Sequence, residues 1–248
     1  MNPKETLRAY DRKEASTDDV MRALMRFDNW LAPAIYASEV LATNLLQKLF
    51  ILGDPSTIPQ DELWLFTDEA AAHTAQAKGA SLGVYANGVP GVRAFAALPA
   101  HLRAAKVNIG SDPADGWFIP QDAFALAGLW ASAIALESWL REPESPEKLK
   151  ALRDFAGYTV LIIPQQDAIA TAQGMGGLKN PAMVFTAPDC AAKVLKQAPQ
   201  LTQNVVSGER LFTLLPSQGV DGVIFNPLGP GPKLAFDLSL CRRVLDGG

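Results

Sequence analysis

The fold of this chain is decided by residues 219–245, which read GVDGVIFNPLGPGPKLAFDLSLCRRVL. The stretch begins with a short apolar segment and passes through a turn rich in Gly and Pro. A second apolar segment and an amphipathic one follow. Asn226 precedes a proline, which favours extended backbone, and the alternating Gly and Pro favour a tight reversal. This order predicts a strand, a turn, a second strand and a helix.

An earlier stretch, residues 105–129, has the same order in a less regular form: AKVNIGSDPADGWFIPQDAFALAGL. Three landmarks recur in the same order after 116 to 119 residues: Phe66-Thr67 and Phe185-Thr186, Leu98-Pro99 and Leu215-Pro216, Val107 and Val223. Chance spacing of apolar clusters seldom repeats so regularly, and a unit of this length has an ordinary domain size. We therefore predict an internal duplication.

Strands and helices are mixed without strict alternation, which predicts an α+β fold with mixed α/β sheets, built of two tandem repeated units packed together. Residues 1–16 alternate acidic and basic side chains and lack an apolar centre, so we expect a polar lead-in and no secretory signal. Residues 142–147, EPESPE, form the clearest composition break. The predicted units are residues 17–142 and 147–248.

Local patterns predict several elements within each unit. Residues 63–66 should form a buried strand followed by a helix capped by Thr67, and residues 183–186 should repeat this junction with Thr186 as the cap. Residues 34–37 are expected to begin a strand. Residues 80–85 are expected to form another strand, followed by a turn at Asn87-Gly88.

Residues 121–141 predict a long helix that is apolar on more than one face. Such a helix needs cover on several sides. We expect it to be covered by the second unit or by another subunit, so a homodimer is possible.

Composition excludes some classes of function. The net charge is −4, the pI is near 5.3 and no run of Lys or Arg exceeds two residues, which does not suit nucleic acid. Two cysteines without a CxxC spacing predict no disulfide framework and favour the cytoplasm. The longest nearly apolar run, residues 123–136, is shorter than the roughly twenty residues that cross a membrane as a helix. A cytoplasmic, soluble protein is expected.

The strand-Phe-Thr junctions, Leu214-Leu215-Pro216 and above all residues 221–227, DGVIFNP, carry a resemblance. In these motifs the chain resembles the SseB family, bacterial proteins named for an enhanced serine sensitivity phenotype. The second unit matches best, whereas the first has Asn108-Ile109-Gly110 where Asn-Pro is expected. The resemblance implies an SseB-like fold. It brings no biochemical activity, catalytic residue or cofactor to this sequence.

The residues that usually carry chemistry form no recognisable set. His73 and His101 lack a metal-binding spacing, so we predict no metal site. Cys190 and Cys241 lie in apolar segments and are expected to be packed thiols. The glycines of residues 174–177 lack the spacing of a phosphate-binding loop. We predict no catalytic residue and no cofactor.

Asn226 is the sharpest candidate for function. In one interpretation residues 226–232 are a hairpin connector; in the other, Asn226 presents its amide to a ligand or partner at the end of a strand. Thr67 and Thr186 are the other candidate binding residues. We expect a non-catalytic SseB-like binding or regulatory protein that recognises a protein partner or a small ligand. The alternative is an enzyme or small-molecule sensor with a site in the groove between the two units.

Overall fold

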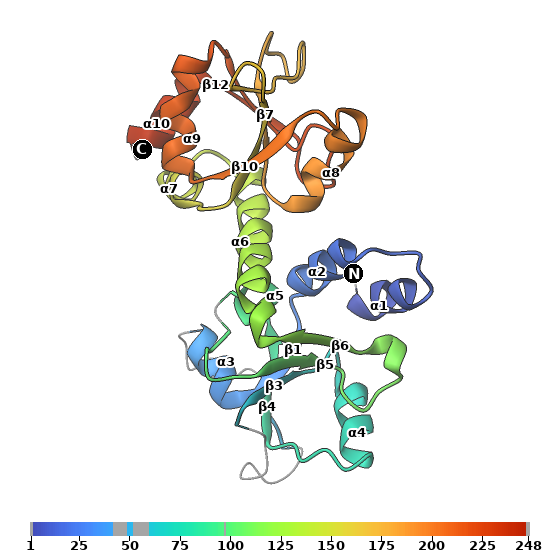
Figure 1. The fold of residues 1–248 in the computed structure, drawn as a ribbon. Helices are drawn as coiled ribbons and strands as arrows, with labels where there is room; N and C mark the ends of the chain where they lie inside the picture. Colours follow the sequence, from blue (N-terminus) through green and yellow to red (C-terminus); the bar gives the residue numbers. More distant parts are fainter. Residues whose placement is uncertain (1, 42–48, 52–59, 97, 247–248) are drawn as a thin grey trace. The chain divides into compact units, whose positions relative to one another are not determined.

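The computed structural model describes residues 2–41, 49–51, 60–96 and 98–246, which form ten α-helices and three β-sheets (Figure 1). The α+β class predicted from the sequence is confirmed. The chain divides into two compact units, Met1–Ser132 and Ala133–Gly248. The division falls inside the long helix, ahead of the composition break.

The first unit contains two three-stranded sheets, ordered β1-β4-β2 and β3-β5-β6. β3 and β5 are parallel, whereas β6 returns antiparallel to β5. The two sheets are joined where Leu31 and Phe66 exchange backbone hydrogen bonds of 2.8 and 2.9 Å. The elements in order are α1 (Pro3–Asp11), α2 (Thr17–Arg26), β1 (Trp30–Pro33), α3 (Ala34–Leu41), β2 (Leu49–Ile51), β3 (Glu62–Leu65), α4 (Glu69–Ala77), β4 (Val84–Val89), α5 (Gly91–Ala94), β5 (Ala104–Val107), η2 (Pro113–Asp115), β6 (Trp117–Pro120), η3 (Gln121–Ala123) and α6 (Phe124–Arg141).

The Ala-rich face of α4 packs into the core of the first unit. Ala71, Ala72 and Ala75 lie against Phe66 and Tyr85, all with at most 3% of their surface exposed. Alanine combines high helix propensity with a small side chain, so the helix can approach the sheet closely. This is the strand-to-helix unit that residues 63–77 predict.

The N-terminal segment is not a polar lead-in, because residues 3–11 form α1. Asn2 caps this helix by accepting from the Lys4 amide, and Leu7 is buried at 2% exposure. Arg8 forms a two-bonded ion pair with Asp115, and Lys4 Nζ lies 2.7 Å from an oxygen of Asp68. Two of the charged side chains that suggested a solvated segment, Lys4 and Arg8, are therefore ion-paired with later residues of the first unit.

Three further local predictions are wrong. Residues 34–37 belong to helix α3, and the strand precedes them as β1, whose first three residues are buried. Asn87-Gly88 lies inside β4, where Gly88 supplies a positive φ of 84° without ending the strand. The predicted caps are also displaced: Asp68, not Thr67, caps α4, and α8 begins after Ala187 without a side-chain cap from Thr186.

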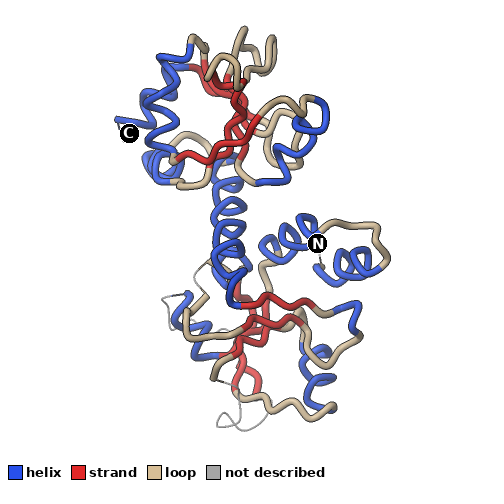
Figure 2. Tube along the Cα trace, in the orientation of Figure 1, coloured by secondary structure: helices blue, strands red, loops and turns tan. Residues whose placement is uncertain are grey.

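The second unit is built on one sheet, whose strands are red in Figure 2. The strand order is β10-β7-β9-β11-β12, and β8 pairs with β7. Helices α7, α9 and α10 contact one another on one side of the sheet, and α8 lies on the other side (Figure 1). The elements in order are α7 (Pro146–Asp154), β7 (Tyr158–Ile163), β8 (Ala168–Ile169), β9 (Ala182–Phe185), α8 (Pro188–Gln197), β10 (Thr202–Val206), α9 (Gly208–Leu214), η4 (Leu215–Gln218), β11 (Gly222–Phe225), β12 (Leu234–Asp237) and α10 (Leu238–Asp246).

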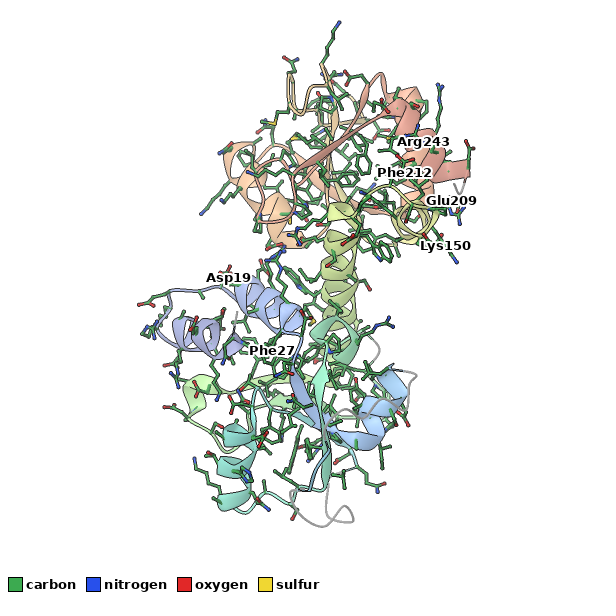
Figure 3. The ribbon with its side chains drawn as sticks, turned by 180° about the vertical axis from the view of Figure 1, so that it is seen from behind. Asp19, Phe27, Lys150, Glu209, Phe212 and Arg243 are labelled. Atoms are coloured by element: carbon green, nitrogen blue, oxygen red, sulfur yellow. The ribbon has the colours of Figure 1, made fainter. Side chains whose placement is uncertain are left out.

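The three helices on one side of this sheet have apolar inner faces and charged outer faces. Phe212 of α9 is 1% exposed and packs edge-on against Tyr158, at 6.1 Å between ring centroids. Lys150, Glu209 and Arg243 are exposed on α7, α9 and α10 (Figure 3). The pattern is that of amphipathic helices covering a sheet, and the strand-turn-strand-helix prediction for residues 219–245 is confirmed.

Several local contacts have the same form in both units. The paired contacts are Trp30 Nε1 to Leu24 O (3.2 Å) and Tyr158 Oη to Leu152 O (3.0 Å), and Gly91 N to Phe27 O and Gly208 N to Phe155 O (both 2.7 Å). A Cβ added to Gly91 or Gly208 would lie 2.2 Å from a carbonyl oxygen, that of Leu24 or Leu152. In both units the start of a later helix, α5 or α9, therefore packs closely against the end of an earlier one, α2 or α7.

Within the described residues, one helical segment, Gln121–Arg141, is long and apolar enough to cross a membrane by length and composition alone. We expected the apolar run to be too short for this. In its most apolar window of 18 residues, 44% of the residues are buried inside the protein, and Trp130 and Leu140 of this helix are each 1% exposed. Burial of this kind is typical of a core helix, so the segment is weak support for a membrane span.

Candidate functional site

In the first unit, the buried polar residue Asn108 connects the ends of two parallel strands. It follows β5, has 1% exposure and adopts a positive φ of 50°. Its Oδ1 accepts hydrogen bonds from the backbone N of Thr67 (2.9 Å) and from Thr67 Oγ1 (3.1 Å). Its Nδ2 donates to the carbonyl of Asp115 at 3.0 Å. The amide thus ties the end of β3 to the turn between β5 and β6.

In the second unit, Asn226 makes a similar set of contacts at the end of β11. It is fully buried and has a φ of 49°. Its Oδ1 accepts from the backbone N of Thr186 at 3.0 Å, and its Nδ2 lies 3.1 Å from Thr186 Oγ1. Nδ2 also donates to the carbonyl of Pro232 at 3.3 Å. Asn tolerates the left-handed region better than most residues, and its amide can both accept and donate.

The predicted binding residues Thr67, Thr186 and Asn226 therefore lie in two buried clusters, one in each unit. Thr67 is 3% exposed and Thr186 is 1% exposed. Their polar atoms face partners inside the same unit, and buried polar groups require such partners. A ligand could reach the Asn226 amide only if these hydrogen bonds opened.

Sequence reasoning missed Asn108 as the partner of Thr67. We matched Val107 with Val223, whereas the structure places Val107 at the end of β5 and Phe225 at the end of β11, directly before Asn108 and Asn226. The useful signal was an Asn directly after each of the two strands. The proline that follows Asn226 is not needed for this arrangement, since Ile109 follows Asn108.

The second cluster contains a buried carboxylate that the sequence analysis also missed. Glu137 of α6 is fully buried, and its Oε1 accepts from Thr186 Oγ1 at 3.1 Å and lies 3.8 Å from Cys190 Sγ. A Cβ added to Gly231 would lie 2.8 Å from Glu137 Oε1 and 2.3 Å from Asn226 Nδ2. The available signal was a single acidic residue within an otherwise apolar helical run.

The first cluster borders a small polar cavity at the start of α4. The cavity has a volume of 290 Å³ and is lined by residues that include Asn29, Thr67, Asp68 and Asn87. Burial raises the pKa of Asp68, but hydrogen bonds from Lys4, the Ala71 amide and Thr67 and the charge of Lys4 outweigh it, so the pKa is lowered. Asp68 is therefore an ionised helix cap paired with α1.

A larger cavity of 550 Å³ lies beneath α3 in the first unit. We call it the α3 cavity. Its apolar lining comes from Pro33, Ala34, Ile35, Tyr36, Leu63, Val84, Pro99 and Leu102, and its polar lining from Glu39, Gln60, Glu62 and His101. Apolar walls with a few polar groups are typical of a small-molecule site. Ile35, one of these lining residues, is 76% exposed, so a large aliphatic side chain at this cavity is accessible to solvent.

Glu62 is the most constrained polar group of the α3 cavity. Its side chain is 5% exposed, and its oxygens lie 2.6 Å from Arg103 Nη2, 2.8 Å from Lys106 Nζ and 2.9 Å from Trp64 Nε1. Burial raises the pKa of Glu62, but the hydrogen bonds from Lys106 and Trp64 and the charges of Lys106 and Arg103 outweigh it and lower the pKa. Glu62 therefore presents a fixed, ionised carboxylate.

The remaining candidates do not assemble into a reactive group. Cys190 and Cys241 are buried cysteines on helices, as predicted, and burial chiefly raises the pKa of Cys241 to about 12. A thiol with such a pKa is a poor nucleophile near neutral pH. His73 and His101 are exposed, and within the described ranges no three His, Cys, Asp or Glu side chains form a metal-binding group.

No family model, no curated protein and no solved structure matches this chain. The resemblance to the SseB family therefore stays a prediction.

Proposed function

We propose that this protein is a non-catalytic, SseB-like binding protein of two related α+β units, with a ligand site in the α3 cavity. The observation that carries the proposal is the cavity itself: 550 Å³ of space whose lining residues are mostly apolar and include the acidic residues Glu39 and Glu62. Small-molecule sites commonly combine such walls with a few oriented polar groups.

The cavity favours a small molecule with an apolar body and a cationic end. Leu63, Val84 and Leu102 are apolar lining residues, and Glu39 and Glu62 are acidic ones. Glu62 already has Lys106 and Arg103 as partners, so Glu39, which is exposed, is the carboxylate better able to accept a new cation. The same chemistry would accept an apolar side chain of a protein partner.

The proposal that the units are related is supported by their matching local geometry. Asn108 and Asn226 share a positive φ, full burial and a Thr partner 40 or 41 residues earlier. In each unit a parallel pair of strands is extended by an antiparallel third strand, β3-β5-β6 and β9-β11-β12. Independent origins would seldom reproduce both the strand order and the buried amide.

Solution NMR tests the ligand site with two small probes of opposite charge, 4-phenylbutylamine and 4-phenylbutyrate. We expect the amine to shift the indole N–H signal of Trp64, whose Nε1 donates to Glu62, with saturation at millimolar concentration or below. The carboxylate probe should bind more weakly, because like charges disfavour it.

Substitutions in α3 provide a matched control. Ala34→Trp fills the cavity and should abolish the shift, whereas Ser38→Trp, on the same helix but outside the cavity lining, should leave it intact. Absence of binding by both probes to the wild-type protein would refute a small-molecule site in this cavity. The alternative, an enzyme or sensor with a site between the two units, stays a prediction.

A further inference from the structure

Strand β10 forms one edge of the sheet in the second unit. Within the described residues it pairs only with β7, through five consecutive residue pairs without a register shift. The first four of its residues, Thr202, Gln203, Asn204 and Val205, are exposed, and Val205 is 61% exposed. An edge strand carries a row of backbone N–H and C=O groups that a further strand can pair with.

The corresponding edge of the first unit is covered by another strand. β4 pairs with β1 as β10 pairs with β7, with Trp30 opposite Val89 and Tyr158 opposite Val206. On its other side β4 pairs antiparallel with β2. The β1–β4 pairing has a register shift after Trp30, so that Ala32 lies opposite Ala86, as Val160 lies opposite Asn204. Under the duplication proposed above, residues 84–86 of β4, which pair with β2, therefore correspond to residues 202–204 of β10. In the part of the chain that the structure describes, this edge therefore pairs with an antiparallel strand in the first unit and with none in the second.

β10 lacks three of the features that usually protect an edge strand from pairing. Native edges are blocked by Pro, by charged side chains, especially Lys, or by bulges. The sequence of β10, TQNVV, contains no Pro and no charge, and its pairing with β7 is regular. The opposite edge strand, β12, differs: Pro232 and Lys233 directly precede it and Asp237 ends it. Only one of the two edges is left open to pairing by its sequence.

We propose that β10 pairs antiparallel with β10 of a second copy of this chain, with the two-fold axis at Asn204. This register places Gln203 opposite the partner's Val205 and Thr202 opposite the partner's Val206. It opposes no like charges, and the two Asn204 amides can donate to and accept from each other. A charged partner strand would find no complementary charge on β10. The symmetric pairing uses the same surface on both copies, so the assembly closes as a dimer.

Charge substitutions test both the dimer and its register. Gln203→Lys with Val205→Lys places Lys directly opposite Lys twice, and directly opposed like charges destabilise strand pairing. Sedimentation equilibrium over a concentration series should show a wild-type dimer and a variant dimer about tenfold weaker. Gln203→Glu with Val205→Lys instead places Glu opposite Lys twice, and this variant should recover wild-type association.

Both positions are exposed in the monomer, so the fold of the second unit should survive the changes, and circular dichroism checks this. A wild-type chain that stays monomeric at its highest soluble concentration overturns the proposal. So does equal association of the wild-type protein and the Lys/Lys variant, or failure of the Glu/Lys variant to recover. None of these outcomes bears on the α3 cavity, which lies in the other unit.

Cross-linking provides a second readout that does not depend on affinity. Asn204→Cys places two thiols at the two-fold axis, where mild oxidation should give a covalent dimer. Thr213→Cys, exposed on α9, is the matched control and should remain monomeric. The native Cys190 and Cys241 are at most 2% exposed and should not react. Equal cross-linking of both variants would indicate random collision and would contradict the proposed pairing.

Discussion

Replacing Asn226 with Ala should destabilise the second unit by about 3 kcal/mol. The backbone N–H of Thr186 would lose its acceptor inside a buried region, which costs about 1–3 kcal/mol. Residue 226 has a φ of 49°, and a residue without a short polar side chain pays about 1 kcal/mol more to stay in the left-handed region. The two contributions add because one concerns the Thr186 partner and the other the backbone of residue 226.

The measurement must report on the second unit alone, because a two-unit chain need not unfold in one step. Amide hydrogen exchange of β9 and β11 under native conditions meets this need. A loss of about 3 kcal/mol should accelerate the most protected amides of these strands about a hundredfold. Asn226→Gly removes the same hydrogen bonds without the backbone cost, so it should be less damaging by about 1 kcal/mol. Gln200→Ala, at an exposed position of the same unit, is the control.

The reasoning would be refuted if Asn226→Ala exchanged like the control, or if Gly were as damaging as Ala at residue 226. The first result would show that the buried amide contributes nothing to stability. The second would show that the positive φ carries no cost there. The equivalent change in the first unit, Asn108→Ala, should accelerate exchange in β3 and β5 by a similar factor, because Asn108 makes the same bonds.

Two further predictions concern the first unit. Gly91→Ala should lower the free energy of unfolding, measured by urea denaturation, by about 3 kcal/mol, because its Cβ would lie 2.2 Å from the Leu24 carbonyl oxygen. The control is Gly116→Ala, whose Cβ meets nothing closer than 3.5 Å and which should be far less destabilising. Equal losses for the two variants would contradict the packing argument. Glu62 has a lowered pKa in the folded chain, so its stabilisation is present above the unfolded pKa of about 4.3 and is lost as pH falls through the folded pKa. Glu62→Gln should therefore lose less thermal stability than wild type between pH 7 and pH 3, and parallel losses would show that Glu62 is not responsible.

Helices and strands were predicted best where a short stretch of sequence contained all the residues that determine the element. Residues 63–77 combine a run of large apolar residues with an acidic helix start, and both β3 and α4 form there. Strand β10 was not predicted, because four of its five residues are exposed and three of them are polar, so no apolar alternation marks it. Its strand conformation is set by pairing with β7, about 40 residues earlier in the chain.

The buried clusters show the same limit for site residues. Asn226 stood out because of the Gly and Pro around it, but its partner Thr186 lies 40 residues away. Asn108 and Glu137 carry no local motif at all, and only contacts of 41 and 49 residues in sequence separation reveal their places. Residue type identified possible donors and acceptors. The fold alone determined which of them meet.

Glu137 also determines how the second unit can be produced in isolation. A fragment that starts at the composition break, residue 147, would omit this glutamate and leave Thr186 Oγ1 without its carboxylate partner and a gap beside Gly231. A fragment that starts at residue 133 retains it, together with the carbonyl of Leu140 to which Lys148 Nζ donates at 3.1 Å. The composition break at residues 142–147 is therefore a poor boundary for an expressed fragment. The longer fragment should be the better candidate for expression and crystallisation.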